Sequence, residues 1–372
     1  MPFMDRRGHT PILLMVSGGS DSTALLELAC ACQQARVEAA ADTQLPALTG
    51  EVSSELGDGS ALDARLRAMM RAALPDLASS ELTVLHVNHM LRGTAADADE
   101  AFVASRCADL VIPCVTKCVD VPALARERGG GFEAVAREVR YKFAEELLGE
   151  RCAANGVSPE QGVICTAHTL DDRIETFLMR TLVGTGPGGF GSIPRSRGNI
   201  RRPLLDAMRE ELRAWLRARH PGVPDSELWR EDATNDDGSN FRSQVRTRLV
   251  PVFRELRPGF EPVLARTMDL VSEEDAMLSA EAESVVYRNL SWDGTIAHFP
   301  ASVLAAMSRP LARRTLRIAL LVVNPDARLE ATQIDRVLDG LGQEGFTTEV
   351  AGGIRVRIRG EELLAFDAYT RY

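Results

Sequence analysis

An apolar run that leads into a Ser- and Gly-rich hexapeptide constrains the fold of this 372-residue chain more than any other feature. Residues 12–16 are all apolar, the hexapeptide SGGSDS occupies residues 17–22, and helix-forming residues continue over 23–34. A strand that passes through glycines into a helix leaves backbone N–H groups without intrahelical partners. These groups and the helix dipole favour an anion at the start of the helix. The segment therefore predicts a phosphate-binding loop.

The residue types of the hexapeptide suit a nucleotide phosphate. Glycines let the backbone approach a phosphate closely, and serine hydroxyls add hydrogen-bond donors. A carboxylate beside a pyrophosphate needs a divalent cation between them, so Asp21 predicts Mg²⁺. A Walker A loop is excluded because it needs a Gly-Lys pair, and the only lysines are Lys117 and Lys142. The alternative is an ordinary capped helix after a strand. The expected ATP contacts in this loop are Ser17, Gly18, Gly19, Ser20, Asp21 and Ser22.

The first half of the chain alternates strand and helix patterns. This alternation predicts an α/β fold with a doubly wound, mainly parallel sheet, whose ligands bind at the carboxyl ends of the strands. The polar segments 86–92 and 166–172 follow predicted strands, as the hexapeptide does, so all three should meet at one edge. Strands are expected at residues 12–16, 82–87, 114–121 and 163–167, and helices at 23–34, 96–109 and 133–152.

The pattern changes along the chain and predicts three parts. Residues 1–204 form the nucleotide-binding catalytic domain, with an insertion at 37–80 that carries Gly breaks and one helical piece. Residues 205–289 are predicted to form a helical linker whose arginines are candidates for contact with a nucleic acid. Residues 290–372 are predicted to form a small α+β domain. In that last part Arg355, Arg357 and Arg359 alternate with apolar residues and should share one face of a strand.

Composition limits the possible partners and compartments. The net charge of -10 argues weakly against nucleic acid as a partner, but arginines crowd residues 195–219 and 242–257. The chain has no apolar run long enough for a membrane span, and residues 1–10 lack the apolar core of a signal peptide. Its seven cysteines form no CxxC pair. These observations predict a cytoplasmic protein with reduced thiols and no membrane partner.

Four further sequence motifs indicate the family to which the chain is similar. HVNHMLRG follows the second predicted strand at 86–93, EAVAREVRY opens a helix at 133–141, TAHTLDDRIET spans 166–176, and GTGPGGF lies at 184–190. With the SGGSDS loop, which resembles the PP-loop of the N-type ATP pyrophosphatases, this order of motifs resembles the tRNA(Ile)-lysidine synthetases. The resemblance continues at 202–205, 231–235 and 242–246 and covers roughly residues 12–251; Ser243 stands where the family usually has Asn.

The resemblance implies an ATP- and Mg²⁺-dependent ligase. Such an enzyme adenylates the wobble cytidine in the CAU anticodon of tRNA(Ile), after which L-lysine displaces AMP at C2 and forms lysidine. The resemblance is compatible with a homodimer but does not establish the oligomeric state. The rival functions are a PP-loop tRNA thiolase, an amidotransferase-linked synthetase and a non-catalytic RNA-binding protein. A thiolase needs an activated thiolate or an iron–sulfur cluster, for which the cysteine spacing gives no support.

Two acidic residues fit the lysine substrate of that reaction. Asp172 and Glu175 are three residues apart on a predicted helix, so their carboxylates share one face. They can bind the lysine ammonium group and receive its proton, which the attacking amine must lose. The alternative is an acidic first helical turn that complements the helix dipole, and this describes Asp171 best.

Basic residues supply the remaining candidates. Arg137 and Arg140 share a helix face with Glu133 and can clamp the α-phosphate, although exposed ion pairs on a surface helix are the alternative. His89 and His168 are expected ATP contacts. The Gly-rich segment 184–191 either closes over the site or is an ordinary connection. The expected tRNA contacts are Arg201, Arg202, Arg209, Arg213, Arg242 and Arg246.

Overall fold

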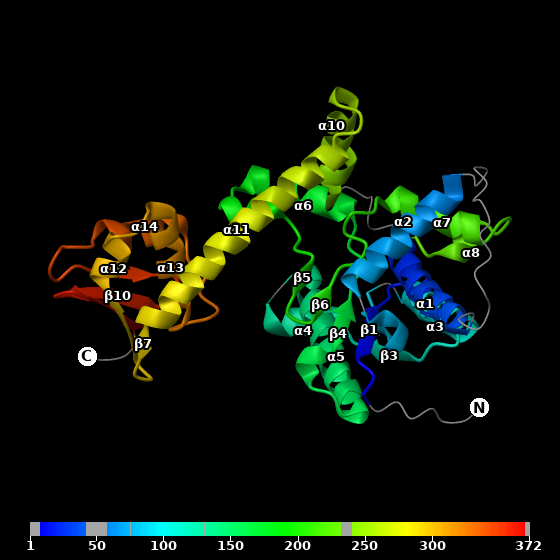
Figure 1. Ribbon diagram of the computed structural model, residues 1–372, viewed down its shortest axis with the longest axis horizontal. Coiled ribbons are helices and arrows are strands. Elements are labelled where there is room, and N and C mark those ends of the chain that lie inside the picture. Colours follow the sequence, from blue (N-terminus) through cyan, green and yellow to red (C-terminus); the bar gives the residue numbers. More distant parts are fainter. Residues whose placement is uncertain are drawn as a thin grey trace. The chain divides into compact units, whose positions relative to one another are not determined.

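The computed structural model describes residues 8–41, 58–74, 76–91, 93–129, 131–231 and 240–368. By its internal contacts the chain divides into two compact units (Figure 1). The first comprises Met1–Leu182 and Ser192–Ala265, and the second comprises Val183–Gly191 and Arg266–Tyr372. The division into three functional parts expected from the sequence stays a prediction.

A six-stranded sheet with the order β3-β2-β1-β4-β6-β5 forms the centre of the first unit. Strands β3, β2, β1, β4 and β6 are paired in parallel, and the short β5 pairs antiparallel with β6. The doubly wound, mainly parallel sheet expected from the sequence is therefore confirmed. The strands are β1 (Pro11–Met15), β2 (Glu81–Asn88), β3 (Cys114–Cys118), β4 (Val163–Cys165), β5 (Ser196–Arg197) and β6 (Ile200–Arg201).

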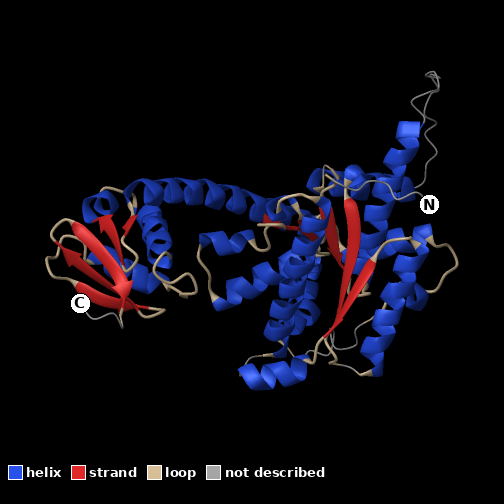
Figure 2. Cartoon of the chain, turned by 90° about the horizontal axis from the view of Figure 1, so that it is seen from below, coloured by secondary structure: helices blue, strands red, loops and turns tan. Residues whose placement is uncertain are grey.

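Helices cover both faces of this sheet, as Figure 2 shows. Alternate residues of β1 point to opposite sides, since Ile12 and Leu14 belong to one apolar cluster and Leu13 to another. The first cluster includes residues of α1, α2 and α7, and the second is completed by α5. The helices of this unit include α1 (Ser20–Ala41), α2 (Asp58–Ala73), α3 (Thr94–Asp109), α4 (Val121–Arg128), α5 (Phe132–Asn155), α6 (Leu170–Val183), α7 (Arg209–Arg219), α8 (Asp225–Leu228), α9 (Phe241–Gln244) and α10 (Val250–Leu256).

The predicted strand 114–121 is too long by three residues. Strand β3 ends at Cys118, and α4 begins at Val121. The Asp120 side chain accepts a hydrogen bond from the Ala123 N–H at 2.8 Å, and Pro122 occupies the first turn. An N-cap followed by proline is a strong helix start, and it overrides the β-branched residues that suggested a longer strand.

The second unit contains a small antiparallel sheet packed against helices. Its strand order is β7-β8-β11-β10-β9, with β7 (Ser291–Trp292), β8 (Ile296–Pro300), β9 (Thr347–Val350), β10 (Ile354–Arg359) and β11 (Glu362–Asp367). Its helices are α12 (Ala301–Ala305), α13 (Arg309–Leu321) and α14 (Ala331–Asp339), together with most of α11 (Glu261–Asn289). Ile354, Val356 and Ile358 of β10 are buried, so the arginines between them lie on the opposite face, as expected. The small α+β domain is confirmed.

The Gly-rich segment packs within this second unit. It forms a 3₁₀ turn at Pro187–Gly191. A Cβ atom at Gly188 would collide with the Asp275 carboxylate, and one at Gly191 would collide with the Ser272 hydroxyl, both on α11. A side chain at either glycine would therefore displace the Asp275 or Ser272 side chain from the position it has against this segment.

The strand order places a ligand crevice beside β1. Strands β2 and β3 lie on one side of β1, and the next strand in the sequence, β4, lies on its other side, so the strand order reverses at β1. Ligands on open α/β sheets bind at such a reversal, at the carboxyl ends of the strands. The loops after β1 and β4 therefore face the expected site. Among the helices of the described segments, none combines the length and apolarity needed to cross a bilayer.

Candidate nucleotide-binding site

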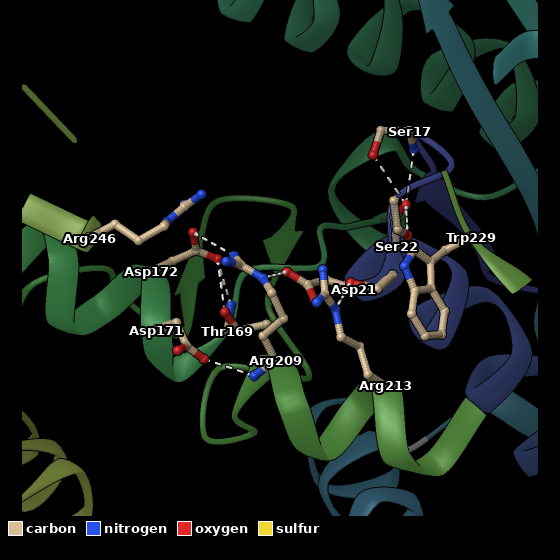
Figure 3. Close-up of polar contacts among 12 residues, drawn as sticks. Ser17, Asp21, Ser22, Thr169, Asp171, Asp172, Arg209, Arg213, Trp229 and Arg246 are labelled. Carbon is tan, nitrogen blue, oxygen red and sulfur yellow. Dashed lines mark hydrogen bonds and ion pairs between the residues drawn. The ribbon is translucent and has the colours of Figure 1, made fainter. Parts of the chain in front are cut away.

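The hydroxyl of Ser22 holds the loop after β1 in shape. The N–H groups of Ser17 and Gly18 each donate to Ser22 Oγ at 3.2 Å, and Ser22 Oγ donates to the Gly19 carbonyl at 3.0 Å (Figure 3). Helix α1 starts at Ser20, so the first N–H groups of the helix have no intrahelical acceptor. The loop thus has the geometry of a phosphate cradle at a helix N-terminus.

Gly18→Ala is expected to distort this loop. Gly18 has a φ of +94°, a backbone conformation that residues with a Cβ rarely adopt, while the space around it would admit a methyl group. Strain of this kind costs roughly 1–3 kcal/mol. Urea denaturation should show the loss, and ATP binding should weaken with it. Gly19→Ala is the matched control for stability, because Gly19 has no positive φ. Equal denaturation midpoints for the two variants would contradict the strain argument.

Asp21 points from the first turn of α1 toward an arginine of α7. Arg209 Nε donates to Asp21 Oδ2 at 2.9 Å, and Ser20 Oγ donates to Asp21 Oδ1 at 3.2 Å. Burial raises the pKa of Asp21 above its ordinary value; the Arg209 charge opposes this rise and the Asp172 charge adds to it. A buried carboxylate beside a second carboxylate favours a nearby cation.

Asp172 lies on the first turn of α6, directly after β4. Its Oδ2 accepts hydrogen bonds from the Thr169 N–H at 2.9 Å and from the Thr169 hydroxyl at 3.1 Å. Its Oδ1 accepts from Arg242 at 3.0 Å. Burial alone would raise the pKa of Asp172, but Arg242, His168, Arg209 and the Thr169 N–H outweigh it, so the pKa is lowered. This carboxylate is therefore held in its charged form.

Glu175 lies one turn further along α6 and binds two arginines. Its side chain is 2% exposed; Arg242 Nε donates to Oε2 at 2.7 Å and Arg246 Nε to Oε1 at 2.6 Å. Arg246 belongs to a π-helical turn at Val245–Leu249, between α9 and α10. Such turns are rare and often occur at functional sites. Asp172 and Glu175 share a face as predicted, and the structure adds that arginines already occupy both carboxylates.

Asp171 has a structural role, in line with the alternative given for it. Its Oδ2 accepts the N–H of Arg209 at 2.7 Å, and Arg209 is the first residue of α7. A carboxylate at this position caps a helix N-terminus and is stabilised by the helix dipole. The cap belongs to α7, however, and not to the helix on which Asp171 lies.

The arginines and histidines predicted to contact ATP lie near the same edge. The Arg137 guanidinium lies 5.0 Å from the centre of the Tyr141 ring, and burial lowers the pKa of Arg140. Burial, with Arg140 nearby, lowers the pKa of His89 to about 4. His89 Nδ1 is buried without a hydrogen-bond partner among the described residues. An unpartnered buried nitrogen is available to a ligand atom.

His168 follows β4 and is also held neutral. Its Nδ1 lies 2.8 Å from the Thr166 hydroxyl. Burial lowers the pKa of His168 to about 4, against the opposing charge of Asp172. His86, in contrast, is 4% exposed and its Nδ1 lies 2.9 Å from the Val16 carbonyl, which fits the packing role expected for it.

Protonation of His168 is expected to destabilise the fold at acid pH. The unfolded chain binds a proton near pH 6.5 and the native state only near pH 4, so the native state binds fewer protons between these values. The contribution of His168 to stability is complete above pH 6.5 and is lost as the pH falls toward 4, by at most about 1.4 kcal/mol per pH unit. Urea midpoints measured from pH 4.5 to 7 should follow this course. His168→Gln should reduce the dependence, and His89→Gln combined with His168→Gln should reduce it further, because the pKa of His89 is also lowered to about 4. Equal profiles for wild type and His168→Gln would contradict this expectation.

The residues predicted to contact tRNA lie in three environments. Arg209 and Arg213 face the loop after β1, and Arg213 Nε donates to Ser20 Oγ at 3.3 Å. Arg242 and Arg246 bind the carboxylates of α6. Arg202 is 5% exposed and donates to the Pro194 carbonyl at 2.7 Å. Arg201 donates to the Ile200 carbonyl at 3.0 Å. Their contact with tRNA stays a prediction.

Sequence reasoning missed a segment that supports the loop. The Arg230 N–H donates to the Gly18 carbonyl at 2.9 Å, and the Arg230 side chain binds Asp99 at 3.2 Å. Trp229, which is 1% exposed, has the Arg213 guanidinium 5.5 Å from its ring centre. The neighbouring motif at 231–235 was a signal for this segment. Arg92 and residues 232–239 lie outside the described residues.

The arrangement suits a nucleotide and a divalent cation. The loop offers donors to phosphate, and Asp21 and Asp172 offer hard oxygen ligands to a cation such as Mg²⁺. No group of three or more metal-binding side chains occurs among the described residues, so phosphate oxygens would have to complete the coordination.

Comparison with known proteins shows the family to which this chain belongs. The PP-loop domain family matches residues 58–253, which is more than half of the chain, so the chain belongs to this family. The SGGSDS loop itself precedes the matched residues, on the other side of the segment 42–57 that is outside the described structure.

Individual relatives share one name. The chain is 35% identical over 294 residues to a tRNA(Ile)-lysidine synthase from Thermus thermophilus, which covers 78% of this chain and 53% of the relative. It is 33% identical over 263 residues to the tRNA(Ile)-lysidine synthase of Geobacter sulfurreducens, covering 69% of this chain and 52% of the relative. The chain thus spans about half the length of these curated relatives.

Solved structures are more distant. A U34-tRNA thiolase from Methanococcus maripaludis with its 4Fe–4S cluster is 13% identical, with 72% of this chain and 74% of that chain covered and a TM-score of 0.41. A likeness at this level carries no functional argument.

Proposed function

We propose that this protein is an ATP-dependent ligase that joins lysine to C2 of the wobble cytidine in the CAU anticodon of tRNA(Ile). The observation that carries the proposal is the meeting of the phosphate-binding loop with the Asp172 and Glu175 carboxylates at one edge of the sheet. The named relatives, at 33–35% identity, support the same activity.

In the first half-reaction, the loop after β1 binds the pyrophosphate part of ATP. Asp21 would hold Mg²⁺, which would supply positive charge to the pyrophosphate leaving group. Arg137 and Arg140 of α5 are the candidates to clamp the α-phosphate, where their charge would stabilise the transfer of AMP to the cytidine O2. His89 and His168, which are neutral at pH 7, can donate or accept one hydrogen bond each to ATP.

In the second half-reaction, the lysine ammonium group binds beside Asp172 and Glu175. These carboxylates are paired with Arg242 and Arg246, so the lysine has to replace at least one guanidinium–carboxylate contact. The released arginine is then free for an RNA phosphate. Transfer of a proton from the ammonium group to one of these carboxylates gives the neutral amine. The amine nitrogen then forms a bond to C2, the bond between C2 and O2 breaks, and AMP leaves with that oxygen.

The cysteines favour a ligase over the rival thiolase. Cys30, Cys107, Cys152 and Cys165 are buried, and burial raises the pKa of Cys30 and of Cys165 to about 12. A thiol with so high a pKa is a poor nucleophile at neutral pH. Cys118 is exposed, and partial desolvation together with the neighbouring Glu100 raises its pKa as well. The half-buried Cys114 is the exception, because a hydrogen bond with Cys107 lowers its pKa. A cytoplasmic location and a homodimer stay predictions.

Labelled substrates test the proposal. The protein is incubated with ATP, Mg²⁺, an unmodified tRNA(Ile) transcript and radiolabelled lysine, and the acid-insoluble label is counted. We expect ATP-dependent incorporation that disappears when the wobble cytidine is replaced by uridine. Label that enters no tRNA, in a preparation that still releases pyrophosphate with the transcript, would exclude lysine as the nucleophile.

A further inference from the structure

Arg209 lies between the two carboxylates nearest the phosphate-binding loop. Its Nε is 2.9 Å from Asp21 Oδ2, and its Nη2 is 3.9 Å from Asp172 Oδ1 (Figure 3). All three side chains are at most a quarter exposed, so solvent screens this charge group only in part. One guanidinium group therefore forms ion pairs with two carboxylates that lie on different helices, α1 and α6.

The position of Arg209 is fixed at the backbone as well. Its N–H donates to Asp171 Oδ2 at 2.7 Å, and α7 packs closely against α1. One turn later Arg213 contacts the Ser20 hydroxyl at 3.3 Å. The backbone at Arg209 is thus anchored beside the loop, while its long side chain retains rotamers that can reach either a carboxylate or a bound phosphate.

The charges around Arg209 show why the site needs a cation. The charge of Asp172 adds to the burial that raises the pKa of Asp21, and the Arg209 charge opposes both. Despite its burial, the pKa of Arg209 is raised above the ordinary value, because Asp21 and Asp172 stabilise the charged form. Without Arg209 or another cation, two half-buried carboxylates would repel each other.

We infer that Arg209 is a positioning residue that acts as the built-in counter-ion of Asp21 and Asp172 in the nucleotide-free protein. It occupies the side of Asp21 that a divalent cation needs, so the cation enters together with a nucleotide and not alone. When the nucleotide brings its cation, the guanidinium turns to the phosphate oxygens. The inference rests on the proposed function only in taking Asp21 as the cation-facing carboxylate.

Binding of Mn²⁺ alone tests this role without tRNA, lysine or turnover. Electron paramagnetic resonance counts free Mn²⁺ during titration of the ATP-free protein. Wild type is expected to bind Mn²⁺ weakly at this site, and Arg209→Gln to bind it roughly tenfold more tightly or better, because two carboxylates lose the guanidinium group that they share. Arg217→Gln is the matched control on the same helix; its guanidinium pairs with Glu210 and Asp225 and should leave Mn²⁺ binding unchanged.

A second substitution and a wild-type measurement complete the test. Adding Asp172→Asn to Arg209→Gln should remove the gained affinity, which a general loosening of the fold would not do. In wild type, Mn²⁺ alone should leave the melting temperature unchanged, while Mn²⁺ with ATP raises it. Equal Mn²⁺ affinity of wild type and Arg209→Gln overturns the inference, and so does strong stabilisation of wild type by Mn²⁺ alone. Failure of lysine ligation would refute the proposed function and leave these results standing.

Discussion

Asp21→Asn is expected to keep its fold and to lose adenylation of tRNA. The amide has the shape of the carboxylate but lacks the charge that binds the Mg²⁺ of the bound ATP. Loss of one such electrostatic contact in the transition state costs about 2.7–4 kcal/mol, so pyrophosphate release should fall by roughly 100- to 1,000-fold. Single-turnover release of labelled pyrophosphate, with circular dichroism as the test of folding, measures this effect.

Asp225→Asn is a matched control for this change. Asp225 is also an acid paired with an arginine, at 2.8 Å from Arg217, but it is far more exposed and does not belong to the loop. Its pyrophosphate release should equal that of wild type. A near-normal rate for Asp21→Asn would remove this residue from the cation site and with it the assigned role of the loop in adenylation.

Glu175→Gln is expected to impair the use of lysine more than the use of ATP. The neutral amide can neither pair with an ammonium group nor accept its proton, and it leaves Arg242 and Arg246 with a weaker partner. We expect a raised KM for lysine, a slower second step and accumulation of adenylated tRNA, with pyrophosphate release largely preserved. Stability should fall by about 1–3 kcal/mol, because the carboxylate is buried and accepts charge-assisted hydrogen bonds.

Glu210→Gln separates this effect from a general change in charge. Glu210 is paired with Arg217 at 2.8 Å, and its side chain is 70% exposed. Such surface pairs contribute about 0–1 kcal/mol, and lysine kinetics should be unchanged in this variant. If Glu175→Gln loses stability but keeps its lysine KM and its second step, Glu175 only holds the two arginines in place.

The sequence predicted the central sheet because its signals are local. The buried runs at β1, β2 and β4 are short, apolar and bounded by turn residues, and each is followed by a helical pattern. The two-residue strands β5 and β6 were not predicted, since such short segments carry no periodicity and form only by pairing, β6 with β4 and β5 with β6.

The loop and the acidic pair could be found in the sequence, whereas the partners of their side chains could not. Asp172 and Glu175 share a helix face by their spacing alone. Arg209 and Arg242 are 37 and 70 positions after Asp172, and only the packing of α7 and of α9 brings them to it. Arginines assigned to tRNA from their clustering therefore turned out to pair with the carboxylates of the site.

The most direct test of the central claim is mass analysis of nucleosides from tRNA(Ile) treated with this protein, ATP, Mg²⁺ and lysine. Digestion to nucleosides and chromatography should reveal a modified cytidine that carries the mass of lysine less one water. The peak should shift when isotopically labelled lysine replaces ordinary lysine, and it should be absent without ATP. Unchanged cytidine, or a sulfur-containing nucleoside when a sulfur donor is supplied, would contradict the account.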